Sequence, residues 1–434
     1  MKMMPSWIDR DLPTPRLIAK KTADNPALYW ISALVFVCGS ALTSCGDIGS
    51  ESTEPESDAT TDAGSNTDQD TVQDTLIDTE SDADTAIDTP EDVESDTVES
   101  INPAERGSYE VGYLTTELTY DRPDNGEVRT LRTAVWYPTE ATEGDQPFYF
   151  GVFPRQNVWE DSEPAPVTDA PVLVYSHGHY GYAEASPELV EHFASHGWIV
   201  IAPDHTGNTT ANNGQPRDTA IYHLRSTDLS AALDWLEALP SDHPLIGMPS
   251  DRIIAAGHSY GGYTTLTACG ASFSEERLDG CPEDGGDFCS SFDDTQLAIF
   301  EAGVRDDRIR AGILMAAGNF GELGAAGVRD VETPLLQLTG GMDLDVTNEA
   351  NGDPIWAALP EGDHVRVNLP RGCHQTFAVG CGLPGELNTQ VGFEIVNTYA
   401  LAFGLRWAEE ILEMDAILSG ETVVNADEVE LSVK

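Results

Sequence analysis

Residues 253–263 read IIAAGHSYGGY, a run of small and branched apolar residues that leads into a serine set among glycines. An apolar run without polar alternation is typical of a strand that is buried on both faces of a parallel sheet. Gly257 and Gly261 leave room for a sharp turn, because a glycine lacks the side chain that would collide with neighbouring backbone. The stretch therefore predicts a strand, a tight turn and a helix, with the hydroxyl of Ser259 turned outward at the helix N-terminus.

Similar apolar runs recur along the chain, and each is followed by a turn and a helical pattern. Examples are PVLVYSHG at 171–178, WIVIAPDH at 198–205 and TPLLQLTGG at 333–341. Strand and helix in alternation predict an α/β domain with a mostly parallel central sheet and helices on both faces. The stretches 108–121 and 128–138 alternate instead, which predicts antiparallel strands at the beginning of the domain.

The pattern Gly-x-Ser-x-Gly between a strand and a helix fits the nucleophile elbow of serine hydrolases. A serine hydroxyl becomes a nucleophile when a histidine removes its proton and a carboxylate orients that histidine. Two histidines follow Ser259 in the sequence, His364 before the apolar run VRVNLP and His374 after it. Ligands gather at the carboxyl ends of parallel strands, so we predict His374 as the catalytic base.

The orienting carboxylate is expected in the stretch LLQLTGGMDLDVT, just past another apolar run. Asp343 and Asp345 both lie there, and their spacing alone does not separate them. The spacing Gly-x-x-Asp from Gly340 favours Asp343, whereas counting from Gly341, which stands four positions before Asp345, favours Asp345. We take Asp343 as the predicted acid and Asp345 as the alternate, the other carboxylate being solvated or capping the loop.

A tetrahedral intermediate needs hydrogen-bond donors for its oxyanion. The backbone N–H of Tyr260, directly after the serine, and that of His179, in the loop after an earlier strand, are the predicted donors. His177 and His179 form an H-x-H pair that invites a metal-site interpretation. Metal-dependent hydrolases of that type continue with Asp and His, whereas Tyr180 and Gly181 follow here, so we predict no metal.

The N-terminal part of the chain has the features of an export signal. Residues 27–45 read ALYWISALVFVCGSALTSC, preceded by Lys20 and Lys21. The uncharged stretch is short for a membrane span but suits the apolar core of a signal peptide. Its end, LTSC, resembles the lipobox of bacterial lipoproteins, in which the cysteine is acylated. We therefore predict a signal peptide at 1–45 and a membrane-anchored exported protein lipidated on Cys45; an uncleaved anchor or a secreted protein are the alternatives.

Charge is distributed unevenly and divides the chain further. The net charge is −53, with 75 acidic and 22 basic residues, which excludes nucleic acid as a partner. Residues 46–105 hold no Lys or Arg and repeat Asp-Thr dipeptides, a low-complexity composition that predicts a disordered acidic tether. The catalytic domain is then expected at 106–415, followed by a C-terminal tail at 416–434.

Export would place the remaining cysteines in an oxidising compartment, where disulfides form. Cys373 and Cys381 bracket HQTFAVG and are expected to pair. Any two of Cys269, Cys281 and Cys289 could close a second bridge, and we name Cys281 and Cys289 as the candidates. No C-x-x-C pair is present, which argues against a zinc cluster.

Six motifs occur in the order found in one known group of enzymes. They are VWYP (135–138), VYSHGHYG (174–181), GWIVIAPDHTGNT (197–209), RSTDLSAALDWL (225–236), GHSYGG (257–262) and GCHQTF (372–377). Together they resemble the bacterial predicted dienelactone hydrolases and platelet-activating-factor acetylhydrolases of the α/β-hydrolase superfamily. The resemblance spans most of residues 106–410 and implies the α/β-hydrolase fold and hydrolysis of carboxylic esters, often with short acyl chains, without a cofactor.

The chain departs from this group at two places. True dienelactone hydrolases use a cysteine nucleophile where Ser259 stands, which argues against dienelactone as the substrate. The Gly-, Asp- and Cys-rich stretch 269–304 is an additional segment, predicted to lie over the site. We therefore predict a serine esterase for small-molecule or lipid esters, including acetylated lipids of the platelet-activating-factor type. An amidase, peptidase or polyester hydrolase on the same residues, and a catalytically silent surface-binding lipoprotein, are the alternatives.

Overall fold

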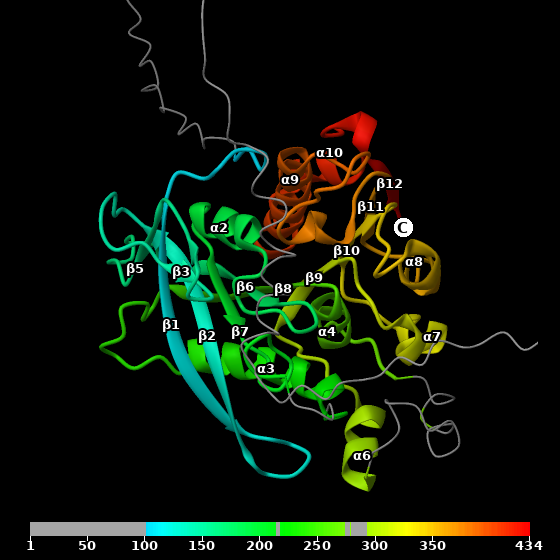
Figure 1. Ribbon diagram of the computed structural model, residues 1–434, viewed down its shortest axis with the longest axis horizontal. Helices are drawn as coiled ribbons and strands as arrows, with labels where there is room; N and C mark the ends of the chain where they lie inside the picture. The colour runs from blue at the N-terminus through cyan, green and yellow to red at the C-terminus, as the bar shows by residue number, and fades with distance from the viewer. Residues whose placement is uncertain (1–100, 214–217, 274–277, 279–292) are drawn as a thin grey trace, which may run out of the picture. The chain divides into compact units, whose positions relative to one another are not determined.

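The computed structural model describes residues 101–213, 218–273, 278 and 293–434 (Figure 1). The predicted signal peptide with Cys45 and nearly all of the acidic tether lie outside these residues. Cys281 and Cys289 lie outside them as well. Within the described part of the chain, no helix is both long and apolar enough to cross a membrane.

A ten-stranded sheet runs through the molecule in the order β12-β11-β10-β9-β8-β6-β7-β2-β1-β5 (Figure 1). The six strands from β11 to β7 pair parallel with one another. Their bounds are Ala170–Ser176 (β6), Ile199–Pro203 (β7), Pro249–His258 (β8), Ile309–Met315 (β9), Leu335–Gly340 (β10) and His364–Leu369 (β11). The predicted mostly parallel sheet is confirmed, and all six strands present their carboxyl ends at one edge.

Antiparallel strands extend the sheet on the side of β7, as the alternating sequence predicted. β1 (Glu110–Asp121) and β2 (Val128–Thr139) form a hairpin along their full lengths, and β2 pairs antiparallel with β7. β5 (Val158–Glu160) adds to β1 in parallel. β3 (Phe148–Tyr149) and β4 (Phe153–Pro154) form a separate two-stranded sheet.

Helices cover both faces of the sheet. α2 (Pro187–Ser195) and α9 (Thr389–Ala408) pack in one core, and α3 (Ile221–Glu237) and α4 (Tyr260–Ala268) pack in the other. The remaining α-helices are α6 (Asp294–Ala302), α7 (Phe320–Val328), α8 (Asp353–Ala358) and α10 (Asp415–Leu418). Short 3₁₀ or π turns are η1 (Asn348–Gly352), η2 (His374–Phe377), η3 (Leu412–Met414) and η4 (Ala426–Glu428).

The central strand β8 shows why its sequence lacks alternation. Ile254 and Ala256 are buried in the core that contains α2 and α9. Ile253 and Ala255 are buried in the core that contains α3 and α4. Since both faces of the strand exclude water, every position favours an apolar residue.

The C-terminal residues differ from the expected tail at 416–434. α10 ends at Leu418, and β12 (Glu430–Val433) pairs antiparallel with β11 at the edge of the sheet. The N–H of Lys434 also donates to the carbonyl of His364. An edge strand presents unpaired backbone groups that a short segment can satisfy. A strand of four residues is too short for its sequence pattern to predict this pairing.

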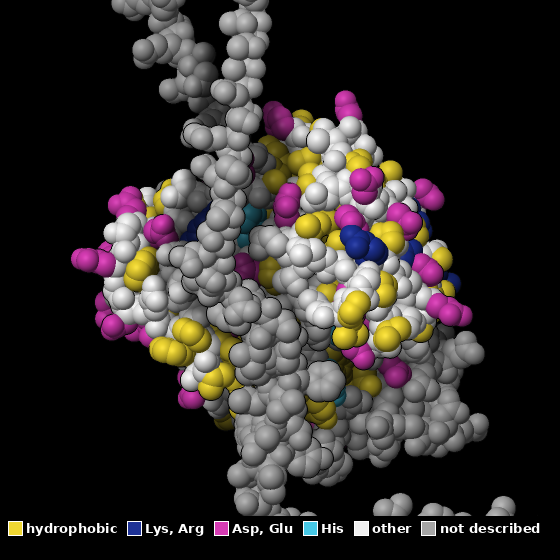
Figure 2. All heavy atoms as spheres, turned by 45° about the horizontal axis from the view of Figure 1, so that its top comes forward, with side chains coloured by type: hydrophobic (Ala, Val, Ile, Leu, Met, Phe, Trp, Pro, Cys, Tyr) yellow, Lys and Arg dark blue, Asp and Glu magenta, His cyan; other side chains and the backbone are white. Residues whose placement is uncertain are grey.

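Acidic side chains are spread over the face of the molecule shown in Figure 2, where basic side chains are sparse. This distribution agrees with the chain's 75 acidic and 22 basic residues. A surface of this sign repels polyanions such as nucleic acids.

Candidate active site

Ser259 lies at the apex of the turn between β8 and α4. Its backbone angles are φ 58° and ψ −118°, a region that residues with a side chain rarely adopt. Hydrogen bonds hold this conformation: the Ser259 N–H donates to the carbonyl of Met315 over 2.8 Å, and its carbonyl accepts from the N–H of Gly262 over 3.0 Å. The side chain is only partly buried, so the turn presents the hydroxyl at the N-terminus of α4.

The glycines of the turn are required by close backbone approach. A Cβ on Gly257 would lie 2.1 Å from the carbonyl oxygen of Gly261. A Cβ on Gly261 would lie 1.9 Å from the carbonyl oxygen of Ser176, at the end of β6. The predicted strand–turn–helix is thus present, and it packs tightly against the end of the neighbouring strand.

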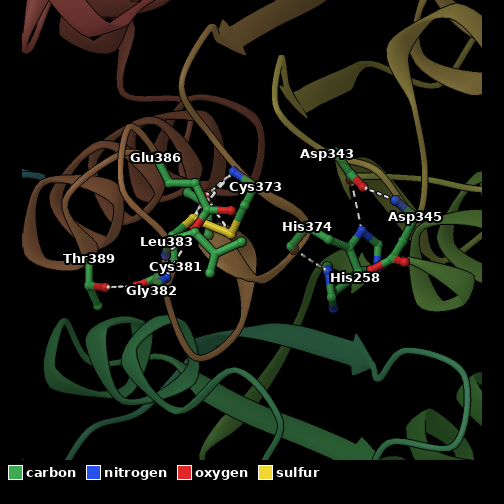
Figure 3. The surroundings of a disulfide bond; sticks show 11 residues. His258, Asp343, Asp345, Cys373, His374, Cys381, Gly382, Leu383, Glu386 and Thr389 are labelled. Carbon is green, nitrogen blue, oxygen red and sulfur yellow. Dashed lines mark hydrogen bonds and ion pairs between the residues drawn. A yellow bond between two sulfur atoms is a disulfide. The ribbon is translucent and has the colours of Figure 1, made fainter. Parts of the chain in front are cut away.

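His374 and Asp343 meet at the same edge of the sheet, after β11 and β10 respectively (Figure 3). His374 Nδ1 lies 2.7 Å from Asp343 Oδ2, and the Asp343 side chain is fully buried. An ionised carboxylate can only accept, so Nδ1 donates and Nε2 is left without the proton. The other oxygen, Oδ1, accepts from the backbone N–H groups of Asp345 and Val346, which fixes the carboxylate in place.

The alternate acid, Asp345, lies beside His374 without forming a hydrogen bond with it (Figure 3). Its side chain is exposed, and one of its carboxylate oxygens lies within 4.8 Å of a ring nitrogen of His374. Among the hydrogen bonds of the described residues, His374 has one with Asp343 and none with the carboxylate of Asp345. The structure therefore brings Asp343, and not Asp345, into direct contact with the histidine.

The predicted disulfide between Cys373 and Cys381 is present next to His374 (Figure 3). The carbonyl of Cys381 accepts from Thr389 Oγ1 at the start of α9. This hydrogen bond connects that helix to the loop from Cys373 to Cys381 that contains His374, called the histidine loop below. Cys269 is buried and carries a free thiol, so it forms no bridge with the other cysteines.

His258 connects the serine turn to the histidine loop. Its Nε2 donates to the carbonyl of His374 over 2.9 Å, and the two rings lie 4.6 Å apart. Burial lowers the pKa of His258 to about 3, so its ring stays neutral at ordinary pH. The sequence did not predict this contact, because it joins two segments that lie far apart in the chain.

The two expected oxyanion donors flank Ser259. Tyr260 is the first residue of α4, where backbone N–H groups lack helical acceptors. His179 follows β6, and a Cβ on its neighbour Gly178 would lie 3.4 Å from the Ser259 Cβ. The His179 ring is held by Asn208, whose Nδ2 lies 3.1 Å from His179 Nδ1.

A second Ser–His–Asp chain lies behind the site, and sequence reasoning did not find it. Ser176 Oγ lies 2.9 Å from His205 Nε2, and His205 Nδ1 lies 2.8 Å from Asp228 Oδ2. Arg129 donates to both oxygens of Asp228 over 2.7 and 2.8 Å. Ser176, His205 and Asp228 are all fully buried, so no substrate reaches the Ser176 hydroxyl. We conclude that these buried hydrogen bonds support the fold of the loops above them.

Both histidines of the H-x-H pair take part in hydrogen bonds. His177 Nδ1 donates to the carbonyl of Gly178 over 2.7 Å, and its Nε2 accepts from the N–H of His205 over 3.1 Å. Both ring nitrogens of His177 are therefore occupied by backbone groups. His179 is held through its Nδ1 by Asn208.

Comparisons with known proteins agree with this architecture. The chlorophyllase family model matches residues 162–276, a range that includes Ser259 and the loop after β6. A solved structure of a ferulic acid esterase from Streptomyces cinnamoneus is similar, with a TM-score of 0.50 and 22% identity over 69% of this chain and 90% of that chain. No curated protein matches the chain. The parallel sheet with a serine turn at its carboxyl edge is the α/β-hydrolase fold.

Proposed function

We propose that the protein is a serine carboxylic-ester hydrolase in which Ser259, His374 and Asp343 form the catalytic triad. The observation that carries the proposal is the strained turn that presents Ser259 at the sheet edge where Asp343 orients His374 by a 2.7 Å hydrogen bond. The chlorophyllase family match and the ferulic acid esterase neighbour support an ester as the substrate.

In the proposed reaction, the Ser259 hydroxyl attacks the ester carbonyl and passes its proton to Nε2 of His374. Asp343 stabilises the imidazolium through Nδ1. The backbone N–H groups of Tyr260 and His179 donate to the oxyanion of the tetrahedral intermediate. The imidazolium then protonates the leaving alcohol, and water, activated by the same histidine, hydrolyses the acyl-enzyme to release the acid.

The proposed substrates are esters of small molecules or lipids with short acyl chains, including acetylated lipids of the platelet-activating-factor type. This narrower assignment rests on the six sequence motifs from VWYP to GCHQTF. Turnover of p-nitrophenyl esters of increasing acyl length, compared with p-nitroanilide amides and polyester films, tests it. We expect the highest kcat/KM for the shortest esters; faster turnover of amides or films would overturn it.

Replacing Ser259 by alanine tests the catalytic assignment. We expect kcat to fall by about 10⁴-fold or more, because the nucleophile is lost while binding and the oxyanion donors remain. Circular dichroism should show an unchanged fold. Ester hydrolysis that persists in the folded variant would contradict the proposal.

We also propose that the protein is exported and anchored to a membrane through lipid on Cys45. The support is the apolar stretch that ends in LTSC and the acidic segment that follows it. Metabolic labelling with a fatty-acid analogue in a bacterial host tests this proposal. Label should appear on the wild-type protein and disappear in Cys45→Ser; equal labelling of both would overturn the assignment.

A further inference from the structure

Arg225, on α3, is a fully buried cation that contacts three of the segments around the site. Its Nε donates to Thr264 Oγ1 over 3.0 Å, and its Nη1 donates to Asn208 Oδ1 over 2.7 Å. Its Nη2 donates to Ser176 Oγ over 3.1 Å and to the carbonyl oxygen of His177. Because the guanidinium is planar and rigid, these contacts fix the three segments relative to one another.

No carboxylate among the described residues forms an ion pair with Arg225. The nearby Asp228, one turn along the same helix, is hydrogen-bonded to Arg129 and His205 instead. Burial lowers the pKa of Arg225 to about 10, so the side chain still carries its charge at neutral pH. A buried charge without a direct counter-ion opposes folding, and a fold that keeps one at an active site suggests a functional reason.

The contacts of Arg225 reach both expected oxyanion donors. Its guanidinium carbon lies 4.7 Å from the centroid of the Tyr260 ring. On the other side it holds the His177 carbonyl, two residues before His179. Asn208, which accepts from Arg225, in turn contacts the His179 ring. One side chain thus connects the start of α4 with the loop after β6.

We propose that Arg225 is a positioning residue that aligns the backbone N–H groups of Tyr260 and His179 and places a positive charge behind them. In a low-dielectric interior such a charge favours the anionic tetrahedral intermediate over the neutral ester. Because the charge is in place before the substrate binds, no reorganisation is needed during the reaction. The inference rests on the proposed ester hydrolysis and adds a source of transition-state stabilisation to it.

The test compares Arg225→Lys, which keeps the charge but loses the planar fork, with Arg225→Met, which loses both. For a p-nitrophenyl ester we expect kcat to fall about tenfold in the lysine variant and about 100-fold in the methionine variant. KM should change by less than about threefold, because the neutral ground state gains little from the charge.

A boronic acid inhibitor separates this role from a merely structural one. Boronic acids bind serine hydrolases as an anionic tetrahedral adduct, so their affinity should fall by the same factor as kcat/KM in each variant. Asn208→Ala, which removes one acceptor of Arg225 and the contact with the His179 ring, should shift kcat and boronate affinity in the same direction. This variant and Arg225→Lys carry the test if Arg225→Met does not fold.

Arg155→Lys is the matched control, because Arg155 is a hydrogen-bonded arginine that pairs with Glu188 and Glu191 instead. It should leave kcat and boronate affinity within about twofold of wild type. Folded Arg225 variants and Asn208→Ala with wild-type kcat and boronate affinity would overturn the inference. Failure of the proposed function is distinguishable, since the wild-type protein would then hydrolyse no ester or Ser259→Ala would remain active.

Discussion

At the residue scale, Asp343 shows how one side chain orients His374 and organises its own loop. One carboxylate oxygen accepts from His374 over 2.7 Å, and the other accepts from the N–H groups of Asp345 and Val346 over 2.9 and 2.7 Å. Since the carboxylate is anchored on both sides, the imidazole has one favoured orientation and one favoured tautomer.

This arrangement predicts a large difference between two similar substitutions. Asp343→Asn should lower kcat by about 10⁴-fold, because an amide NH₂ facing Nδ1 favours the wrong tautomer of His374. Asp345→Asn should change kcat by less than about threefold, because the exposed Asp345 side chain makes no hydrogen bond with His374. Steady-state kinetics on one p-nitrophenyl ester measures both. Comparable losses in the two variants would contradict the assignment.

The sequence could predict the elbow serine and the histidine from their order and placement after apolar runs. It favoured Asp343 over Asp345 by one of two possible spacings but could not separate them firmly, because the direction of each side chain depends on the turn that Asp343 itself caps. The sequence also could not predict the contacts of Arg225. They join Ser176, Asn208 and Thr264, which come together only in the folded sheet.

At the element scale, the serine elbow depends on close packing between β8, α4 and β6. Gly257→Ala would place a Cβ 2.1 Å from the Gly261 carbonyl oxygen, so backbone must move. We expect a loss of about 3 kcal/mol or more in the free energy of unfolding, with a loss of kcat. Urea denaturation and ester kinetics measure the two effects.

Gly321→Ala on α7 is the control for this substitution. A Cβ at Gly321 would meet nothing within 4 Å, so the change should leave kcat unaltered and stabilise the protein by up to about 1 kcal/mol. If Gly257→Ala were as stable and as active as Gly321→Ala, the close packing of the elbow would not be what holds Ser259.

The histidine loop is a second element whose geometry rests on a covalent constraint. The Cys373–Cys381 disulfide closes a short loop with a sequence separation of 8. Replacing both cysteines by serine should lower the free energy of unfolding by about 2–3 kcal/mol, because the unfolded chain gains freedom. We also expect a lower kcat, since Cys373 directly precedes His374.

Cys269→Ala is the control, because it removes a buried thiol that forms no disulfide. Its kcat should stay within about twofold of wild type. If the double serine variant kept both the stability and the kcat of wild type, the disulfide would not hold the histidine loop.

Element prediction succeeded where the pattern was long and failed where it was short. The continuous apolar runs of β6, β7, β8 and β10 predicted buried parallel strands, and the structure confirms them. β12, by contrast, has four residues, and its pairing with β11 is decided by the open edge of the sheet. Periodicity carries no information about such an edge.

At the scale of the whole molecule, buried neutral histidines link stability to pH. Burial lowers the pKa of His205 and of His258 to about 3, and holds that of His177 well below the usual range. In the unfolded chain each titrates near 6.5. The unfolded state therefore binds more protons below that pH, and stability falls as the pH is lowered toward the folded pKa.

We predict that the free energy of unfolding decreases between pH 6.5 and about pH 5, where most surface carboxylates remain ionised. His205 and His258 should each contribute about 2 kcal/mol of this loss at about pH 5. About pH 5 lies roughly 1.5 units below the pKa of a histidine in the unfolded chain, so the unfolded state binds a proton there that the folded state does not, and each unit is worth about 1.4 kcal/mol. Urea denaturation at several pH values measures it. A constant or increasing stability over this range would show that these histidines are accessible to protons in the folded protein.

The central claim is that Ser259 is the single nucleophilic serine of the protein, with His374 as its base and Asp343 as the residue that orients the base. Labelling with a fluorophosphonate probe, followed by mass spectrometry of the peptides, tests this claim most directly. We predict a single adduct on Ser259 that is absent in Ser259→Ala and forms much more slowly in Asp343→Asn. An unlabelled protein, or an adduct on another serine such as Ser176, would contradict the account.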